Sequence, residues 1–117
     1  MNLRECYEKM HGDYDDVCER LPREESVIKF LKRFLDDKNF PELMAAVAEE
    51  DYEKIFSTTH NLKGICANLS ITRLKESSSE LCEAVRHGKP NYDIQSFVDK
   101  VAKDYEDTKQ AISELSQ

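Results

Sequence analysis

Three residues near the middle of the chain, His60, Lys63 and Gly64, have types and spacing suited to group-transfer chemistry. A neutral histidine ring nitrogen is a nucleophile near pH 7 and can form covalent intermediates. A lysine three residues further on lies one helical turn away, where its ammonium can neutralise a phosphoryl group on the ring. Glycine inside a helix costs about 1 kcal/mol relative to alanine, so Gly64 needs a reason. We interpret Gly64, with the small Ala67 one turn on, as a shallow notch through which a partner approaches the His60 ring.

The element that must position these residues is a helix expected to run from Asp51, as its N-cap, to about Leu69. With about 100° of rotation per residue, its apolar residues share one predicted core face. That face carries Tyr52, Ile55, Phe56, Thr59, Leu62, Cys66 and Leu69. A second stripe, at i, i+3, i+4 and i+7, carries His60, Lys63, Gly64 and Ala67. We expect this stripe to follow the border of the core face, with the His60 ring partly supported and partly exposed at the edge of the fold.

Simpler explanations of the same residues stay open at this point. A histidine on a helix border is often only a solvated polar residue, and a lysine three residues later is common. A glycine in the middle of a helix is also found where two helices pack closely together. The alternatives to a reactive site are therefore a solvated His60 and a Gly64 that serves packing.

The composition favours helices and excludes several kinds of partner. The chain has 117 residues with only 3 glycines and 3 prolines, which disfavours a turn-rich β-sandwich or barrel. It carries 17 basic and 24 acidic residues, a net charge of −7, so binding to nucleic acid is not expected. No apolar run approaches the roughly 18 residues of a membrane span. The polar N-terminus lacks a signal-peptide core, so we expect a cytoplasmic protein without membrane association.

The apolar periodicity predicts an all-α fold, an antiparallel up-down four-helix bundle preceded by one or more short helices. Four helices of more than about twelve residues, joined by short turns, would have to pack as antiparallel neighbours. We expect a single domain over residues 1–117, with an N-terminal helical extension at 1–21 and the bundle at 22–117.

Residues with capping preferences predict where the helices begin and end. Asp13 is expected to cap a short helix, Pro22 to stand in the first turn of the next, and Asn39 to cap a third as part of a capping box with Glu42. Three further predictions concern the second half of the chain. Ser70 and Asn91 are expected as N-caps, and Gly88 as the left-handed residue that ends the helix running to Arg86 or His87.

Four cysteines, Cys6, Cys18, Cys66 and Cys82, are spaced irregularly and form no C-x-x-C pair. In a reducing compartment such residues behave as small apolar side chains with free thiols. Zinc binding through cysteine and histidine is the weaker alternative, because the spacing of a zinc site is missing. No metal site is predicted.

The run from Thr59 to Leu69, with its H-x-L-K-G core, resembles the histidine-containing phosphotransfer (HPt) domain family of multistep phosphorelays. The resemblance extends to the preceding helix, around Phe30 to Asp37, and to the following one, around Leu74 to Gly88. It covers roughly Glu24 to Leu115, while the first twenty residues add little to it.

The resemblance implies a role for each residue of the motif. His60 would accept a phosphoryl group on its Nε2 from the aspartyl phosphate of a response-regulator receiver domain, and pass it to another receiver aspartate. Lys63 would stabilise the phosphoryl group and Gly64 would keep the approach open. The protein would be a phosphoryl carrier without kinase activity or a cofactor of its own, because the receiver supplies Mg²⁺. Its partners would be receiver domains and a hybrid sensor histidine kinase, and the family implies a monomer.

Two positions depart from the family pattern. Ser70 stands where many relatives have glycine, and Cys82 falls near a position where many have a glutamine across from the histidine. Cysteine is a weak hydrogen-bond partner, so the orientation of the His60 ring should depend on something else. The predicted partner-binding residues are Phe56, Ala67, Lys75, Ser79, Cys82 and Arg86. For Lys75 and Arg86, the alternative to partner binding is simple solvation. For the whole protein, the alternative function is a non-catalytic helical module that binds a receiver or another helical partner.

Overall fold

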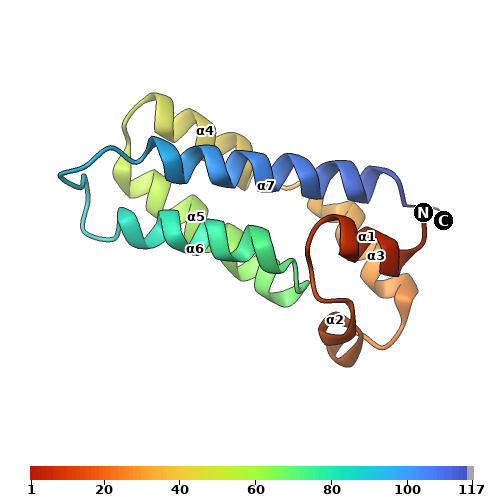
Figure 1. Ribbon diagram of the computed structural model, residues 1–117. Coiled ribbons are helices and arrows are strands. Elements are labelled where there is room, and N and C mark those ends of the chain that lie inside the picture. The colour runs from red at the N-terminus through yellow and green to blue at the C-terminus, as the bar shows by residue number, and fades with distance from the viewer. Residues whose placement is uncertain (116–117) are drawn as a thin grey trace.

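The structure, a computed structural model, describes residues 1–115 and is built from helices throughout that range (Figure 1). The helices are α1 (Leu3–Lys9), α2 (Tyr14–Arg20), α3 (Glu24–Phe34), α4 (Asn39–Ala48), α5 (Tyr52–Asn68), α6 (Thr72–Ala84) and α7 (Gln95–Ser113). The molecule is elongated, with extents of 44 × 22 × 19 Å. The predicted all-α bundle is confirmed. No helix within the described range is both long enough and apolar enough to cross a membrane.

Helices α4, α5, α6 and α7 form the bundle, and each runs opposite to the one before it (Figure 1). Helix α5 packs between α4 and α6, and α6 also packs against α7. Helix α3 precedes α4, and we call the two together the first arm of the bundle. This arm is divided into two short helices, since α3 has 11 residues and α4 has 10. The expectation of four helices longer than about twelve residues was therefore wrong for this arm. Its two parts meet α7 through one ring, since Tyr105 stacks on Phe40 at 3.9 Å and lies 5.9 Å from Phe34, between ring centroids.

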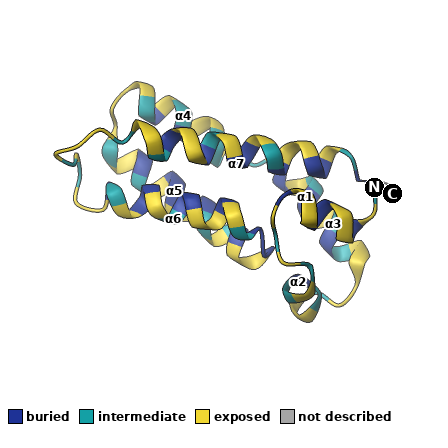
Figure 2. Cartoon of the chain, in the orientation of Figure 1, coloured by how far each residue is buried: buried dark blue, intermediate teal, exposed yellow. Residues whose placement is uncertain are grey.

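Buried side chains line the inner faces of the helices along the whole length of the molecule (Figure 2). On α5 the predicted core face is buried at Ile55, Leu62 and Cys66, whereas Tyr52 and Phe56 are only half-buried. The 3.6-residue period of the sequence therefore located the core side of this helix correctly, except at its first two aromatic residues.

Some predicted helix caps are confirmed and others were wrong. Asp13 and Asp51 accept hydrogen bonds from the backbone N–H groups of Asp16 and Lys54 and begin α2 and α5. Pro22 precedes α3 instead of standing in its first turn, since Arg23 occupies the N-cap position.

Asn39 and Asn91 do not cap their helices. Asn39 is itself the first residue of α4, and its backbone N–H donates to the Asp37 carboxylate at 3.0 Å. Asp93 plays the same part before α7, where it accepts from the N–H of Gln95 at 2.9 Å. In both cases the N–H of the first helical residue donates to an aspartate two positions earlier, and the predicted asparagine does not serve as the cap.

Ser70 does not cap α6, whose N-cap position is taken by Ile71. It ends α5 instead, with a left-handed backbone at φ 55°. The N–H of Ile71 bonds to the carbonyl of Cys66 at 2.9 Å and the N–H of Ser70 to that of Ala67 at 3.3 Å, which is a Schellman motif. Glycine usually occupies this position because it lacks a Cβ. The serine therefore occupies, with some strain, a helix-end position that favours glycine, and it does not begin α6.

Gly88 adopts the predicted left-handed backbone, with φ 92°. The α-helix before it ends earlier than predicted, at Ala84, and turns cover residues 85–88.

The N-terminal helices α1 and α2 pack against the turn between α5 and α6. The Tyr7 hydroxyl donates to the carbonyl of Leu69 at 2.7 Å, and the N–H of Asp13 donates to the carbonyl of Ser70 at 2.9 Å. A Cβ on Gly12 would lie 2.7 Å from that same Ser70 oxygen, so Gly12 permits a close approach of two segments. These contacts pack residues 1–21, the predicted extension, against the bundle. Burial in this contact raises the pKa of the Tyr7 hydroxyl.

The four cysteines are free thiols, of which only Cys18 is not fully buried. Burial raises the pKa of the Cys6 thiol to about 11 and also raises that of Cys66. These thiols remain protonated near neutral pH and serve as apolar packing. Within residues 1–115, no group of three or more His, Cys, Asp and Glu side chains is placed to hold a metal ion.

Candidate functional site

His60 stands at the middle of α5 on the side of the helix that faces solvent, and it is exposed. Its ring lies parallel to that of Phe56, one turn earlier, with 6.0 Å between centroids and 16° between planes. Within the described chain, neither ring nitrogen makes a hydrogen bond or an ion pair with another residue. The ring is therefore supported on one face and has both nitrogens open to an incoming group.

The stripe of His60 is more exposed than the sequence predicted. His60, Gly64 and Ala67 are all exposed, and only Lys63 is half-buried as expected for a border position. Helices α4 and α6 are the main neighbours of α5, and their packing leaves His60, Gly64 and Ala67 exposed. The Lys63 side chain forms no ion pair with any carboxylate of the described residues.

Gly64 opens onto free space. A Cβ built at this position would meet no heavy atom within 4 Å outside its own helix and its chain neighbours. Close packing between helices therefore does not explain the glycine, and that alternative was wrong. Alanine would make the helix more stable here. Packing within the protein therefore gives no reason for a glycine at this position.

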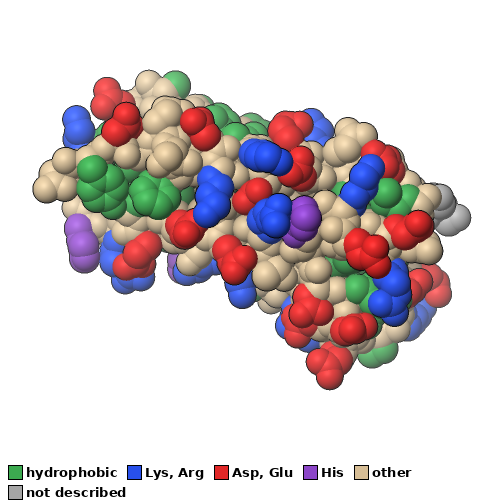
Figure 3. Space-filling model, in the orientation of Figure 1, with side chains coloured by type: hydrophobic (Ala, Val, Ile, Leu, Met, Phe, Trp, Pro, Cys, Tyr) green, Lys and Arg blue, Asp and Glu red, His purple; other side chains and the backbone are tan. Residues whose placement is uncertain are grey.

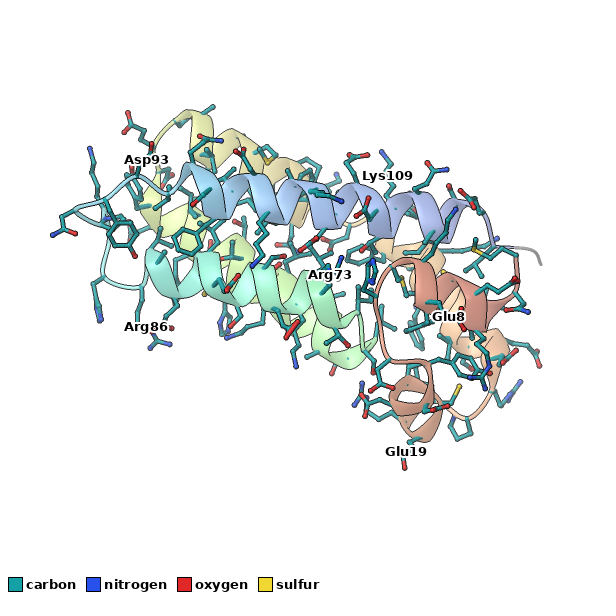
Figure 4. The ribbon with its side chains drawn as sticks, viewed as in Figure 1. Glu8, Glu19, Arg73, Arg86, Asp93 and Lys109 are labelled. Atoms are coloured by element: carbon teal, nitrogen blue, oxygen red, sulfur yellow. The ribbon has the colours of Figure 1, made fainter. Side chains whose placement is uncertain are left out.

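Three of the other predicted contact residues, Lys75, Ser79 and Cys82, lie on α6, and Arg86 follows this helix. Cys82 is 3% exposed, and its thiol lies 3.9 Å from the carbonyl oxygen of Phe56. It thus lies beneath Phe56 and offers almost no surface of its own. Lys75 is exposed and Ser79 is half-buried. Arg86 lies beyond the end of α6 and points away from the bundle (Figure 4), where it pairs with Glu83 at 3.1 Å.

A hollow that the sequence did not reveal lies beside the exposed stripe of α5. It has a volume of about 540 Å³, and α2, α3 and α5 contribute its walls. Its apolar lining consists of Leu21, Phe30, Phe34, Ile65 and Leu69, and Arg20, Arg33, Asp36, Asp37 and Asn68 form the polar part. We call this hollow the α2–α3–α5 groove.

Phe30 is the sequence signal that could have revealed this groove. It stands one residue away from the buried stripe of α3, and it is 39% exposed. The guanidinium carbon of Arg33 lies 5.6 Å from the centroid of its ring. The end of α5 lines the groove with Ile65, Asn68 and the C-cap residue Leu69. Asn68 lies one helical turn after Gly64 on the same side of α5, so the groove adjoins the exposed stripe.

The charge on the surface is mixed. Figure 3 shows acidic and basic side chains interspersed over one face, without a continuous basic stripe. Acidic side chains gather around the short helix α2, which has Asp15 and Asp16 in its first turn.

Comparison with known proteins gives one match. The model of a family described as Hpt domain matches residues 29–117. The match includes α4 to α7 and the second half of α3, and it leaves α1 and α2 outside. No curated protein and no solved structure matches the chain.

Proposed function

Because the chain belongs to the Hpt domain family, whose members carry out histidine phosphotransfer in phosphorelays, we propose that it carries phosphoryl groups on His60. It accepts the group from the aspartyl phosphate of one receiver domain and passes it to the aspartate of another. The observation that carries this proposal is the exposed His60 ring, with two free nitrogens, beside the open backbone of Gly64.

The proposed transfer is a displacement at phosphorus. The lone pair of the unprotonated ring nitrogen attacks the phosphorus atom, and a P–N bond forms as the P–O bond to the aspartyl carboxyl group breaks. The electron pair of the broken bond stays on the carboxylate oxygen. The second ring nitrogen keeps its proton during attack and releases it to solvent afterwards. The reverse sequence returns the group to a receiver.

Lys63 supports this chemistry through its position. It lies one turn from His60 on the same side of α5 and is not engaged with any carboxylate of the described chain. Its ammonium is therefore available to offset the negative charge of a phosphoryl group on the ring. In this proposal the receiver domain supplies Mg²⁺ and its acidic ligands, and this chain contributes no cofactor and no kinase activity. We also propose that the protein acts as a monomer in the cytoplasm, where a hybrid sensor histidine kinase is a further candidate partner.

The surface around His60 suits a protein partner. The exposed stripe adjoins the α2–α3–α5 groove at Asn68, and the groove has five apolar residues and a partly charged rim. An apolar centre with a polar rim is the usual composition of a protein interface. We propose that a receiver domain seated over His60 extends into this groove.

Incubation with a phosphorylated receiver domain tests the proposal. We expect the wild-type protein to take up label that is stable to base and labile to acid, and His60→Gln to take up none. His11→Gln and His87→Gln are the matched controls and should label like the wild type, since these two histidines lie outside α5. Absence of label from the wild type with every receiver offered would contradict the proposal.

A non-catalytic binding module is the second candidate, and the groove favours it because apolar binding there does not require His60. In that case a receiver should bind the wild type and His60→Gln equally, and no phosphohistidine should form. Binding by titration calorimetry together with the labelling experiment separates the two functions.

A further inference from the structure

Phe56 has a place in the site that neither the family nor the motif explains. We propose that Phe56 is a positioning residue, which fixes the plane of the His60 ring for transfer. This inference rests on the proposed function of His60 and names how the chain orients its nucleophile. It differs from the expected role of Phe56 as a surface for partner binding.

The geometry of the two rings is the first argument. They lie 16° from parallel with 6.0 Å between centroids, inside the range of favourable offset stacking. The reactive lone pair of an imidazole nitrogen lies in the plane of the ring. A neighbour that covers one face therefore restrains the plane without obstructing the nucleophile, whereas a neighbour at the edge would block it.

The second argument is that no other group of the described chain holds the ring. Histidine orientation is commonly set by a hydrogen bond to the nitrogen that does not react, and His60 has no such partner within residues 1–115. The thiol of Cys82 is directed to the carbonyl oxygen of Phe56, at 3.9 Å, and not to the imidazole. The stacked ring of Phe56 is thus the restraint that the structure provides.

The third argument concerns the firmness of Phe56 itself. Its side chain is half-buried and packs against the core cluster, while Cys82 lies beneath its backbone. A ring anchored in this way loses little further entropy when a partner arrives, and precise orientation of a nucleophile is worth large factors in rate.

The test compares Phe56→Leu, Phe56→Tyr and wild type, with Tyr92→Leu as the control. Tyr92 is an aromatic residue 54% exposed in the connection before α7, outside the site. In single-turnover transfer from a phosphorylated receiver, we expect the rate at saturating receiver to fall about tenfold in Phe56→Leu. The receiver concentration at half-saturation should stay near the wild-type value. Phe56→Tyr keeps the ring and should transfer like the wild type, as should Tyr92→Leu.

Two further measurements separate positioning from nucleophilicity and from the proposed function. Phosphoramidate, a small donor that can approach from any direction, should label His60 equally fast in Phe56→Leu and wild type. In NMR spectra, the His60 ring resonances, identified by their loss in His60→Gln, should shift in Phe56→Leu and hold in Tyr92→Leu. If no receiver transfers, the proposed function fails, and these resonances then report whether the Phe56 ring lies against the His60 ring. Unshifted resonances, or a change in half-saturation without a change in rate, would overturn the inference.

Discussion

At the scale of single residues, the role proposed for Gly64 sets the stability of α5 against access to His60. A Cβ at this position would meet no heavy atom within 4 Å outside its own helix and its chain neighbours, so the isolated molecule has room for alanine here. A partner that reaches His60 over this position has to share that space. In this proposal, Gly64 lowers the stability of α5 and in return leaves room for a partner to reach the His60 ring.

Replacement of Gly64 tests this view at the same scale. Gly64→Ala should increase the free energy of unfolding by about 0.5–1 kcal/mol, because the flexible residue leaves the helix interior, and urea denaturation measures this change. Gly64→Gln should also keep α5 intact but lower the rate of transfer from a receiver at least about tenfold, since its side chain occupies the approach. Equal transfer rates for Gly64→Gln and wild type would show that the notch has no such role.

At the scale of elements, the end of α5 is held by a polar cluster from α2. The Arg20 guanidinium donates to the carbonyl of Ala67 at 2.8 Å and also bonds to Ser70 Oγ. Ser70 Oγ donates to the Asp16 carboxylate at 2.7 Å, and Asp16 pairs with Arg20 at 3.0 Å. These bonds satisfy carbonyl groups at the end of α5 that the helix itself leaves free. They also stabilise a serine in a left-handed conformation that glycine would adopt with less strain.

Asp16 makes this cluster dependent on pH. The hydrogen bond from Ser70, and then the charge of Arg20, lower the pKa of Asp16 below its usual 3.8. A group whose pKa is lowered by folding stabilises the protein above the unfolded value and loses that contribution as the pH falls through the folded value. Asp16→Asn should therefore lower the urea midpoint at neutral pH, and the difference from wild type should shrink as the pH falls below 3.8.

Asp15→Asn is the matched control for this element. Asp15 precedes Asp16 on α2, is exposed, and forms no ion pair with other described residues. We expect the urea midpoint of Asp15→Asn to equal that of the wild type at every pH. A difference between Asp16→Asn and wild type that is the same at neutral and acid pH would contradict the assigned role of the carboxylate.

At the scale of the whole molecule, α2 adds a wall to the surface beside His60. This helix lies outside the region matched by the Hpt domain family, yet Arg20 and Leu21 line the α2–α3–α5 groove. The opposite wall comes from α5 itself, at Ile65 and Leu69. A partner that is seated over His60 and extends into the groove would therefore contact residues outside the region that the family model matches.

Phe30→Asp tests whether the groove belongs to the docking surface. A charge in the apolar lining should weaken the binding of a receiver about tenfold, as for other central interface residues, while the protein stays folded because Phe30 is 39% exposed. Titration calorimetry measures the affinity. Tyr92→Asp is the control and should bind normally, because Tyr92 lies in the connection between α6 and α7. This connection is at the opposite end of the molecule from α2 (Figure 1). Unchanged affinity in Phe30→Asp would exclude the groove from the interface.

The sequence by itself determined the helices and the core side of α5, and it singled out His60, Lys63 and Gly64 as the candidate site. These features are local, since the 3.6-residue period places apolar residues on one side whatever the partners are. Only the tertiary structure decided how exposed His60 is, that Gly64 faces open space and that Phe56 stacks on the imidazole.

The helix ends show the same division. Asp13 and Asp51 cap as predicted because an N-cap bond spans only three residues. Ser70 was wrongly expected to cap α6, because its hydroxyl bonds to Asp16 and Arg20, 50 or more positions away. The groove depends in the same way on α2, α3 and α5 coming together. Contacts between residues so distant in sequence are set by the packing of helices, which no local period encodes.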